Sequence, residues 1–273
     1  MLWDHGIGAA WSSFVVAGPY AVTLEQREKD ECLTCYRLSD GELIWIHEHA
    51  GFHENPLGGV GPRSTPTIHG DKVYATSATG FLWCVNLANG EIIWTANLLE
   101  LAGWNQSTFE TAAPWGYAGS PLLAEGLCVV PLGGPVGGAS SASLIALDAA
   151  TGDVVWKSGD DQLSYASPTL VTLDGQRQIV SVNENTVSGH QITDGKMLWQ
   201  FDWPGSTNTN ANCSSAVPVG DDSLLVGKGY GGGSALVEIK GEETNWKTSD
   251  IWRSNRILKT KFNHTCVDGS VGY

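Results

Sequence analysis

The stretch Ala146-Leu147-Asp148-Ala149-Ala150-Thr151-Gly152-Asp153-Val154-Val155-Trp156 decides the fold of this chain. Its apolar first part is typical of a β-strand that ends at Asp148, and the pair Thr151-Gly152 is typical of a tight turn. A second strand over residues 153–157 then places the indole of Trp156 at a fixed distance from that turn. The stretch therefore predicts a β-hairpin that carries a tryptophan for docking.

The same hairpin recurs along the chain, with a glycine four residues before a tryptophan. Residues 35–45, 84–94 and 189–199 keep this spacing, whereas in residues 236–246 Gly241 is one place out of register. Two further apolar runs precede each hairpin, so that each repeat predicts four short strands. The five repeats span residues 12–46, 65–95, 120–157, 167–201 and 214–246.

The spacing of the repeats predicts a β-propeller. The tryptophans at 45, 94, 156, 199 and 246 are 49, 62, 43 and 47 residues apart, a period typical of four-stranded blades. We expect an all-β fold of about five complete antiparallel blades, with half a blade at each end, at residues 1–3 and 263–273. Residues 1–273 are interpreted as one domain.

A ring of seven or eight such blades needs about 350 to 400 residues at this period, so we expect part of the ring to be missing. The alternative is a six-bladed ring in which residues 1–4 complete the last blade. The longest interval between tryptophans contains an insertion, residues 98–114, whose Leu98-Leu99-Glu100-Leu101-Ala102 segment is compatible with one or two helical turns.

Composition and charge exclude several classes of protein. The formal net charge of −14 disfavours a general nucleic-acid or anionic-membrane surface. No run of about 18 apolar residues predicts a membrane-spanning helix, and the first residues lack the pattern of a signal peptide. Among the six cysteines, Cys35 and Cys84 occupy the small position ten residues before a tryptophan, which favours structural thiols over a redox or zinc role.

The repeat resembles the tryptophan-docking motif of the pyrroloquinoline-quinone (PQQ) type β-propellers, Ala-x-Asp-x-x-Thr-Gly-x-x-x-Trp. Residues 146–156 match every fixed position of that motif, and the other repeats keep mainly the glycine and the tryptophan. The resemblance implies a fold shared by quinoprotein alcohol dehydrogenases and by non-enzymatic relatives, among them an outer-membrane assembly lipoprotein. It also suggests a periplasmic or secreted location, although the sequence itself leaves the compartment open.

Two sets of functional residues follow from blade geometry. The loops that enter each first strand and the loops between second and third strands are expected on one face, around the mouth of a central channel. The candidate ligand-binding residues on this face are Arg27, Arg63, Trp115, Tyr165, Asn183, Lys228 and Lys261, and residues 98–114 are a candidate partial lid. The alternative is that these are solvated loop residues. The docking tryptophans Trp45, Trp94, Trp156 and Trp199 are interpreted as structural.

The resemblance raises the question of a bound cofactor. Quinoprotein dehydrogenases hold PQQ with calcium, a tryptophan and a disulfide of adjacent cysteines, and this chain has no adjacent cysteines. Glu184 with Asn185, or Asp160 with Asp161, are candidate oxygen ligands for calcium, but acidic pairs in loops are ordinarily only solvated. His47 and His49 are interpreted as exposed edge residues, and residues 227–234 as a strand connection.

We therefore expect a non-catalytic PQQ-like propeller that serves as a binding or protein-interaction module. No catalytic residue, metal site or cofactor is predicted. The expected partner is a protein or a small anionic ligand at the channel mouth, and the sequence does not identify it. The alternative is an alcohol dehydrogenase-type oxidoreductase that depends on PQQ and calcium.

Overall fold

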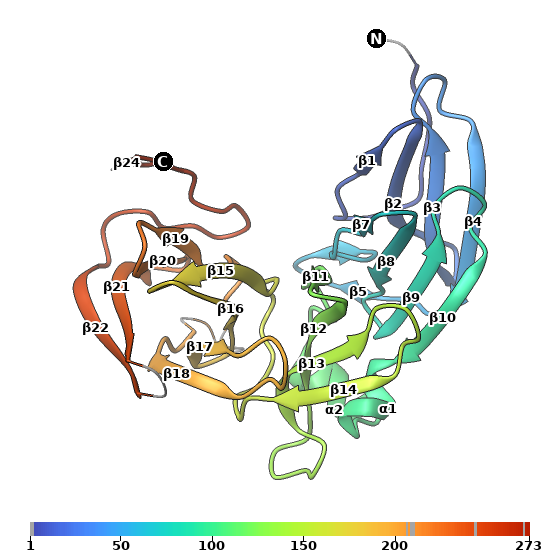
Figure 1. Cartoon of the computed structure of the whole chain (residues 1–273). Coiled ribbons are helices and arrows are strands. Elements are labelled where there is room, and N and C mark those ends of the chain that lie inside the picture. The colour runs from blue at the N-terminus through green and yellow to red at the C-terminus, as the bar shows by residue number, and fades with distance from the viewer. Residues whose placement is uncertain (1–2, 206, 208–210, 243–244, 270) are drawn as a thin grey trace. The chain divides into compact units, whose positions relative to one another are not determined.

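The computed structural model describes residues 3–205, 207, 211–242, 245–269 and 271–273. Within these residues there are five four-stranded antiparallel sheets, each with its strands in meander order (Figure 1). The first two sheets contain β1 (Val15–Ala17), β2 (Tyr20–Arg27), β3 (Asp30–Arg37) and β4 (Leu43–Ala50), and then β7 (Thr67–His69), β8 (Lys72–Thr76), β9 (Phe81–Asn86) and β10 (Ile92–Asn97). The third contains β11 (Leu122–Ala124), β12 (Leu127–Gly133), β13 (Ala142–Asp148) and β14 (Val154–Ser158). The last two contain β15 (Thr169–Leu173), β16 (Gln176–Val182), β17 (Thr186–His190) and β18 (Met197–Asp202), and then β19 (Val217–Val219), β20 (Ser223–Lys228), β21 (Gly233–Glu242) and β22 (Asn245–Ser254). The all-β propeller prediction is thus confirmed, and we number these sheets as blades 1 to 5.

Shorter elements complete the fold. The strands β5 (Glu54–Asn55) and β6 (Gly59–Val60) form a small hairpin after blade 1, and β23 (Val267–Asp268) pairs with β24 (Val271–Gly272) after blade 5. The pair β23–β24 is the half-blade expected near the C-terminal end. The insertion holds two helices, α1 (Leu98–Ala102), as predicted, and α2 (Gln106–Ala112), which the sequence did not reveal.

The chain divides into two compact units. Unit 1 comprises residues 1–128 and 147–154, and unit 2 comprises residues 129–146 and 155–273, so the β11–β14 sheet contributes to both. In unit 1 a core of fully buried apolar residues from blades 1 and 2 includes Val22, Leu33, Val73 and Val85. Unit 2 has its own core in blades 4 and 5.

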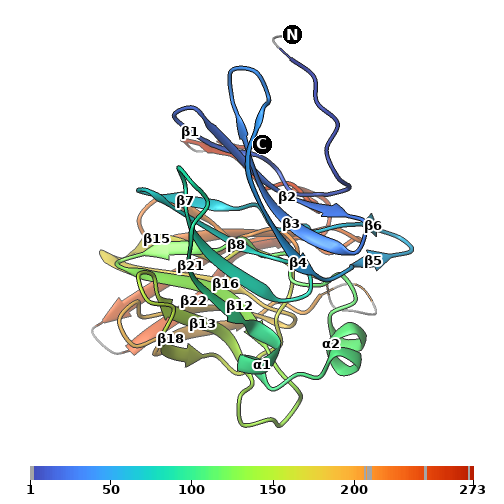
Figure 2. The same ribbon diagram turned by 90° about the vertical axis from the view of Figure 1, so that its right-hand side faces the viewer.

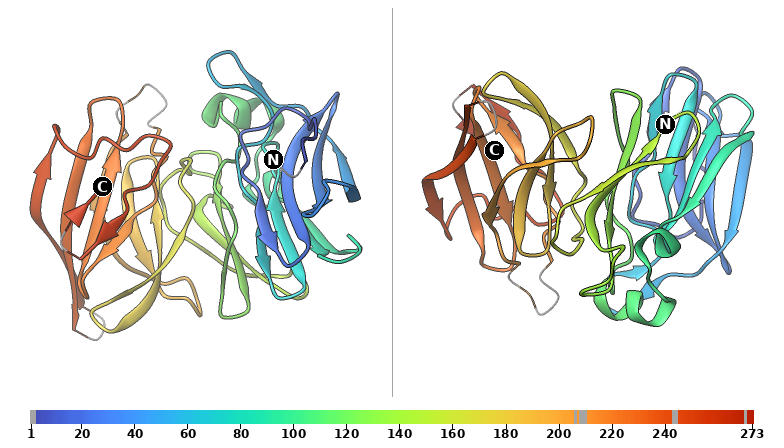
Figure 3. Two further views of the ribbon diagram at one scale, coloured as in Figure 1. Left: turned by 90° about the horizontal axis from the view of Figure 1, so that it is seen from above. Right: turned by 60° about the horizontal axis from the view of Figure 1, so that its bottom comes forward.

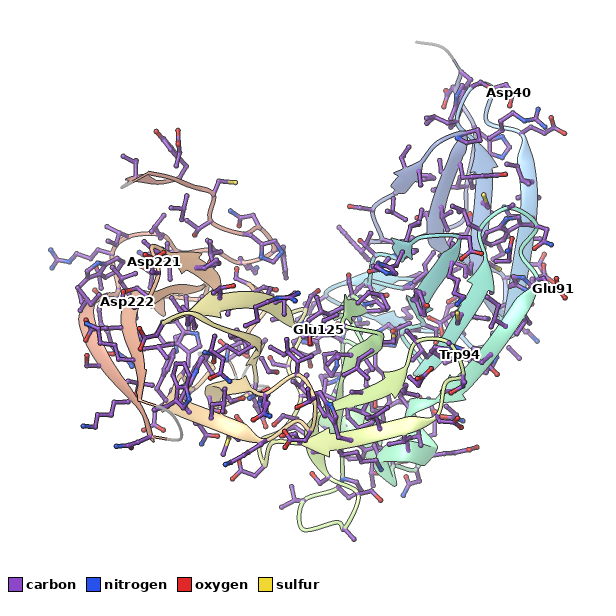
Figure 4. The ribbon with its side chains drawn as sticks, viewed as in Figure 1. Asp40, Glu91, Trp94, Glu125, Asp221 and Asp222 are labelled. Atoms are coloured by element: carbon purple, nitrogen blue, oxygen red, sulfur yellow. The ribbon has the colours of Figure 1, made fainter. Side chains whose placement is uncertain are left out.

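Docking tryptophans join successive blades in a regular way. The indole N–H of Trp45, Trp94 or Trp156 donates to a carbonyl oxygen of the next blade's last hairpin, and the indole covers the glycine three residues further on. The acceptors are Leu87 (2.9 Å), Ala149 (3.1 Å) and Ile192 (2.9 Å), and the covered glycines are Gly90, Gly152 and Gly195. Figure 4 shows the Trp94 side chain beside the turn that precedes β14.

The same contact occurs at Trp3, ahead of blade 1. Its indole N–H donates to the carbonyl oxygen of Leu38 at 2.8 Å, and the ring lies against Gly41. Trp3 is partly exposed and belongs to no strand. Trp3 therefore makes the docking contact expected of a fourth strand, although residues 3–8 form no strand.

Trp199 is different from the other docking tryptophans. Its indole N–H donates at 2.6 Å to the side-chain oxygen of Gln178 within the same blade, and its ring lies over its own small partner Gly189. The next blade has a longer hairpin at this point, because β21 and β22 are strands of ten residues each (Figure 3). In the register of that hairpin, Trp252 pairs with Leu236 beside a bulge, as Trp45 pairs with Cys35. The positional equivalent in blade 5 is therefore Trp252, and Trp246 lies in the extension.

The cysteines lie mainly in the core. Cys32, Cys35, Cys84 and Cys128 are fully buried in strands and form no disulfide, and Cys266 is exposed. Burial raises the pKa of the Cys35 thiol to about 12 and that of Cys84 to about 11. These thiols are therefore protonated at neutral pH, as suits a structural role.

Candidate binding surface

In each unit the loops that enter first strands lie against the loops between second and third strands. In unit 1 the amide of Leu98 donates to the carbonyl oxygen of Gly80 at 2.8 Å, and that of Tyr117 donates to Ala78 at 2.9 Å. In unit 2 the amide of Asn185 donates to the carboxylate of Asp161 at 2.7 Å. The two kinds of loop thus share one end of the sheets within each unit, and we call this end the loop face.

The insertion packs on the loop face of unit 1. Phe109 of α2 is buried and stacks on Tyr117, with ring centroids 4.9 Å apart, and Leu98 and Ala102 of α1 are fully buried. Figure 2 shows α2 below the β5–β6 hairpin, and the side-chain amide of Asn55 in that hairpin donates to the carbonyl oxygen of Pro114 at 3.0 Å. The insertion is therefore held by its own core contacts.

Arg27, at the end of β2, is engaged by a buried carboxylate. Its guanidinium lies 3.0 Å from a carboxylate oxygen of Glu25, which is fully buried, and 2.9 Å from the hydroxyl of Tyr36. Burial by itself would raise the pKa of Glu25, but hydrogen bonds from neighbours that include Gly8 and Tyr36 outweigh it and hold the pKa below its ordinary value. The charge of Arg27 is thus largely balanced within the protein.

Arg63 and Trp115 meet in unit 1. The guanidinium carbon of Arg63 lies 5.9 Å from the centre of the Trp115 ring, a cation–π distance. Its nitrogen atoms also donate to the carbonyl oxygens of Gly61 at 3.1 Å and Gly59 at 3.3 Å. Arg63 therefore stabilises the β5–β6 segment while its side chain stays partly accessible.

Tyr165 and Asn183, both in unit 2, are buried. The amide of Asn183 donates to the hydroxyls of Thr186 at 3.2 Å and Ser188 at 3.0 Å, and its side-chain oxygen accepts from Ser181 at 2.6 Å. The backbone of Tyr165 donates to the carbonyl oxygen of Asn212 at 3.0 Å. The structure places both residues beneath the loops, which they hold together.

Lys228 is part of a group that the sequence did not reveal, which we call the Lys228 cluster: Lys228, Trp203 and Arg253. The ammonium nitrogen of Lys228 lies 4.1 Å from the centre of the buried Trp203 ring, and the guanidinium carbon of Arg253 lies 5.5 Å from it. Arg253 is also paired with Asp250 at 2.5 Å, and Lys228 donates to the carbonyl oxygen of Pro204. Two cations thus share one aromatic ring.

Lys261 belongs to a second group, the Lys261 cluster: Lys261, Tyr230 and Phe262. Its ammonium nitrogen lies 4.4 Å from the centre of the Tyr230 ring and 4.8 Å from that of Phe262. Tyr230 is 48% exposed and Phe262 is 77% exposed. The β20–β21 loop joins the two clusters, because Lys228 ends β20 and Tyr230 follows two residues later.

The predicted cations are divided between the units, with Arg27 and Arg63 in unit 1 and Lys228 and Lys261 in unit 2. A channel mouth shared by all four remains a prediction. Within the described residues, Lys228 and Lys261 form no ion pair with a carboxylate, whereas Arg27 does. The loop position of a cation does not reveal whether it is paired with a carboxylate or packed on a ring. For Lys228, the ring is that of Trp203, which comes from another loop.

Asp161, one of the residues suggested for calcium, is engaged in hydrogen bonds between loops. The carboxylate of Asp161 accepts hydrogen bonds from the backbone and side-chain nitrogens of Asn185 at 2.7 and 2.9 Å and from the hydroxyl of Thr186 at 2.8 Å. These contacts use its oxygen atoms to fix the loops. The described residues contain no group of three or more His, Cys, Asp or Glu side chains arranged for a metal ion.

The meander sheets and docking contacts define a β-propeller of the PQQ-like class. The model of the family described as outer membrane protein assembly factor BamB matches residues 29–264, and the chain therefore belongs to this family. Among the described residues, no helix combines the length and the apolar character that crossing a bilayer requires.

Known relatives fall into two functional groups. BamB from Moraxella catarrhalis has a solved structure that superposes with a TM-score of 0.63 at 16% identity, covering 98% of this chain and 70% of that one. Quinohemoprotein alcohol dehydrogenase ADHIIG from Pseudomonas putida HK5 superposes with a TM-score of 0.55 at 12% identity, covering 92% of this chain and 43% of that one. At these identities the likeness shows the fold.

A curated relative has higher local identity. Quinohemoprotein alcohol dehydrogenase ADH IIB of Pseudomonas putida is 30% identical over 107 residues, which are 38% of this chain. The chain spans only 14% of the length of that relative. The comparisons therefore establish a family that includes both interaction proteins and enzymes.

Proposed function

We propose that this protein is a non-catalytic binding module that holds an acidic segment of a partner polypeptide on the loop face of unit 2. The observation that carries the proposal is the pair of cation–aromatic clusters around Lys228 and Lys261. Membership of the BamB family supports a protein-interaction role, and with it a location in the periplasm or at the outer membrane.

The Lys228 cluster favours an anion. Burial lowers the pKa of Lys228, and the neighbouring positive charge of Arg253 lowers it further. Lys228 has no carboxylate partner within the described residues, so the two cations repel each other across Trp203. A bound carboxylate would relieve this repulsion, because an opposite charge within a few ångströms stabilises the charged form of each group.

The Lys261 cluster favours a polypeptide over a small inorganic anion. Tyr230 and Phe262 expose flat apolar surface beside the ammonium group. Aromatic residues and cations are enriched where proteins bind one another, since the rings supply buried area while the charge selects the partner. An acidic segment that carries apolar side chains matches both parts of this surface.

The test measures binding of a synthetic hexaglutamate peptide and of the same peptide with a central phenylalanine, by fluorescence anisotropy at low salt. A Lys228→Ala, Lys261→Ala double variant is compared with Lys196→Ala, Arg177→Ala, which removes equal charge from exposed positions of the same unit. We expect at least tenfold weaker binding by the first variant and little change in the second, because screening is weak at low salt.

Equal binding by the two double variants, with both folded, would show that the clusters are only a solvated rim. The quinoprotein alternative, favoured by the local identity to ADH IIB, is tested separately. Protein incubated with PQQ and calcium is desalted, its quinone absorbance is measured, and dye-linked alcohol oxidation is assayed. Retained quinone together with turnover would replace the non-catalytic proposal.

A further inference from the structure

A pocket of about 260 Å³ is lined entirely by residues of unit 1. It is formed where the end of β4 meets the β8–β9 loop, the start of β9 and the two helices of the insertion. Its lining residues are His49, Ala50, Gly51, Phe52, Thr79, Phe81, Asn97, Leu99 and Gln106. Pockets for drug-sized ligands are about 300 to 1,000 Å³, so this one suits a single long side chain or a molecule of that size.

Aromatic rings form one wall of the pocket. The imidazole of His49 stacks on Phe81 with centroids 3.9 Å apart and planes 14° apart, and it meets Trp83 edge-on at 6.0 Å. Phe52, on the same segment as His49, is 49% exposed. An accessible phenylalanine ring presents a negative face that attracts organic cations.

The surrounding charges are negative. The carboxylate of Glu31 lies beneath the pocket and accepts the amide of Thr79 at 3.1 Å, while Glu100 and Glu110 bond the side chains of Asn97 at 3.2 Å and Gln106 at 2.8 Å. None of the nine lining residues is a lysine or an arginine. Burial keeps the pKa of His49 below its ordinary value although Glu31 and Asp30 act against it, so its ring is uncharged at neutral pH.

Hydrogen-bond acceptors remain available in the lining. Within the described part of the chain, the ring nitrogens of His49 take part in no hydrogen bond, and the side-chain oxygen of Gln106 accepts none. The glycine at position 51 is needed here, because a β-carbon would lie 2.8 Å from the Thr79 hydroxyl and 3.1 Å from Glu31. The close approach of these segments shapes the pocket.

We propose that this pocket binds an organic cation with the dimensions of an arginine side chain, held flat against the aromatic wall and hydrogen-bonded to His49 and Gln106. The guanidinium group supplies a positive charge for the surrounding carboxylates, a plane for the aromatic wall and donors for the acceptors of His49 and Gln106. The cation comes either from a free small molecule or from a side chain of a bound polypeptide. The site is independent of the clusters in unit 2, which select anions.

The experiment follows the His49 imidazole by NMR during titration with N-acetyl-L-arginine amide, free L-arginine, and N-acetyl-L-citrulline amide as the uncharged isostere. We expect saturable shifts with both arginine compounds and at least tenfold weaker binding of the citrulline compound. Tighter binding of the amide-blocked arginine favours a polypeptide side chain as the source, and tighter binding of free arginine favours a small molecule.

Two variants test the position of the site. Gln106→Lys places a cation at the rim of the pocket and is expected to weaken arginine binding at least tenfold. Thr172→Lys adds the same charge on an exposed strand of unit 2 and is expected to leave binding unchanged. Equal affinities of the two variants, equal affinities for the arginine and citrulline amides, or no saturable shift of His49 would overturn the proposal.

Discussion

Trp156 and Trp199 occupy the same place in adjacent blades, yet they make different contacts. Trp156 reaches the next blade, where it covers Gly195 and donates to Ile192, whereas Trp199 donates to Gln178 of its own blade. The two tryptophans differ because the blade that follows each of them differs. Blade 4 has a tight glycine turn that contacts Trp156, whereas blade 5 has an extended hairpin after Trp199. The comparison shows that docking between blades depends on the turn that receives the indole as much as on the tryptophan.

The largest effect is expected from Trp156→Ala. Trp156 is buried and joins two blades, and truncation of a buried tryptophan typically costs about 3 to 5 kcal/mol of unfolding free energy. Urea denaturation measures this loss of unfolding free energy. Trp11→Ala, at a position that is 64% exposed, is the control and should stay within about 0.5 kcal/mol of the unmodified protein. A small loss for Trp156→Ala would mean that the contact contributes little.

The turn that receives Trp156 is also sensitive to pH. His190 is fully buried, lies 2.9 Å from the hydroxyl of Ser158, and contacts the carbonyl oxygen of Gly195 at 3.2 Å. Burial lowers its pKa from an ordinary value of 6.5 to about 4, so protonation favours the unfolded chain. The contribution of neutral His190 is complete above pH 6.5 and is lost as the pH falls towards 4.

We therefore expect the unfolding free energy to fall by up to about 3 kcal/mol from this residue over that range. The measurement is a series of urea titrations between pH 7 and pH 4. In His190→Asn, the slope of unfolding free energy against pH should decrease by an amount that corresponds to about one bound proton. An unchanged slope would show that His190 titrates alike in the folded and unfolded chains.

A smaller effect is expected from Gly152→Ala in the Trp94 contact. Gly152 has φ +80°, and a β-carbon there would lie 2.7 Å from the Trp94 ring. The left-handed conformation costs about 1 to 2 kcal/mol for an L-residue, and displacement of the indole adds to it. Gly175→Ala is a matched control with φ +76° and open space, so it isolates the conformational part. Similar melting temperatures of the two variants would contradict the docking contribution.

The smallest effect is expected from Trp3→Ala. Trp3 repeats the contact of Trp45 with a glycine and a carbonyl oxygen, but it is partly exposed and belongs to no strand. Removing it should lower the unfolding free energy by about 1 kcal/mol, because less apolar surface leaves water when the contact forms. Thermal unfolding compares Trp3→Ala with Trp45→Ala. If both variants lost the same stability, the position of Trp45 in strand β4 would add nothing to the docking contact.

The sequence predicted the blades because each repeat carries a glycine and a tryptophan at fixed spacing. It missed α2, whose seven residues bury only Phe109 and therefore show no helical periodicity. It also assigned the fifth repeat to Trp246, since the hairpin extension moved Trp252 out of the spacing. In each case a local change of length or composition removed the pattern without altering the meander of strands.

The candidate site was less predictable than the fold. Blade geometry placed Lys228 and Lys261 on loops, but the residues that hold them, Trp203 and Phe262, could be recognised only from contacts. The same geometry gave no sign that Asn183 is buried or that Arg27 is paired with Glu25. Sequence position predicts which face a loop occupies, whereas the partners of a side chain depend on packing.

The positions of the cysteines allow the opening of strands in unit 1 to be followed by chemical modification. Cys32, Cys35, Cys84 and Cys128 are buried in unit 1, Cys213 is partly buried in unit 2, and Cys266 is exposed. An alkylating reagent should therefore modify Cys266 first, and it should reach Cys32, Cys35, Cys84 and Cys128 only when their strands open. Mass spectrometry of peptides from a timed reaction would then give opening rates for the strands of unit 1. The reaction of each buried thiol thus reports when its own strand opens.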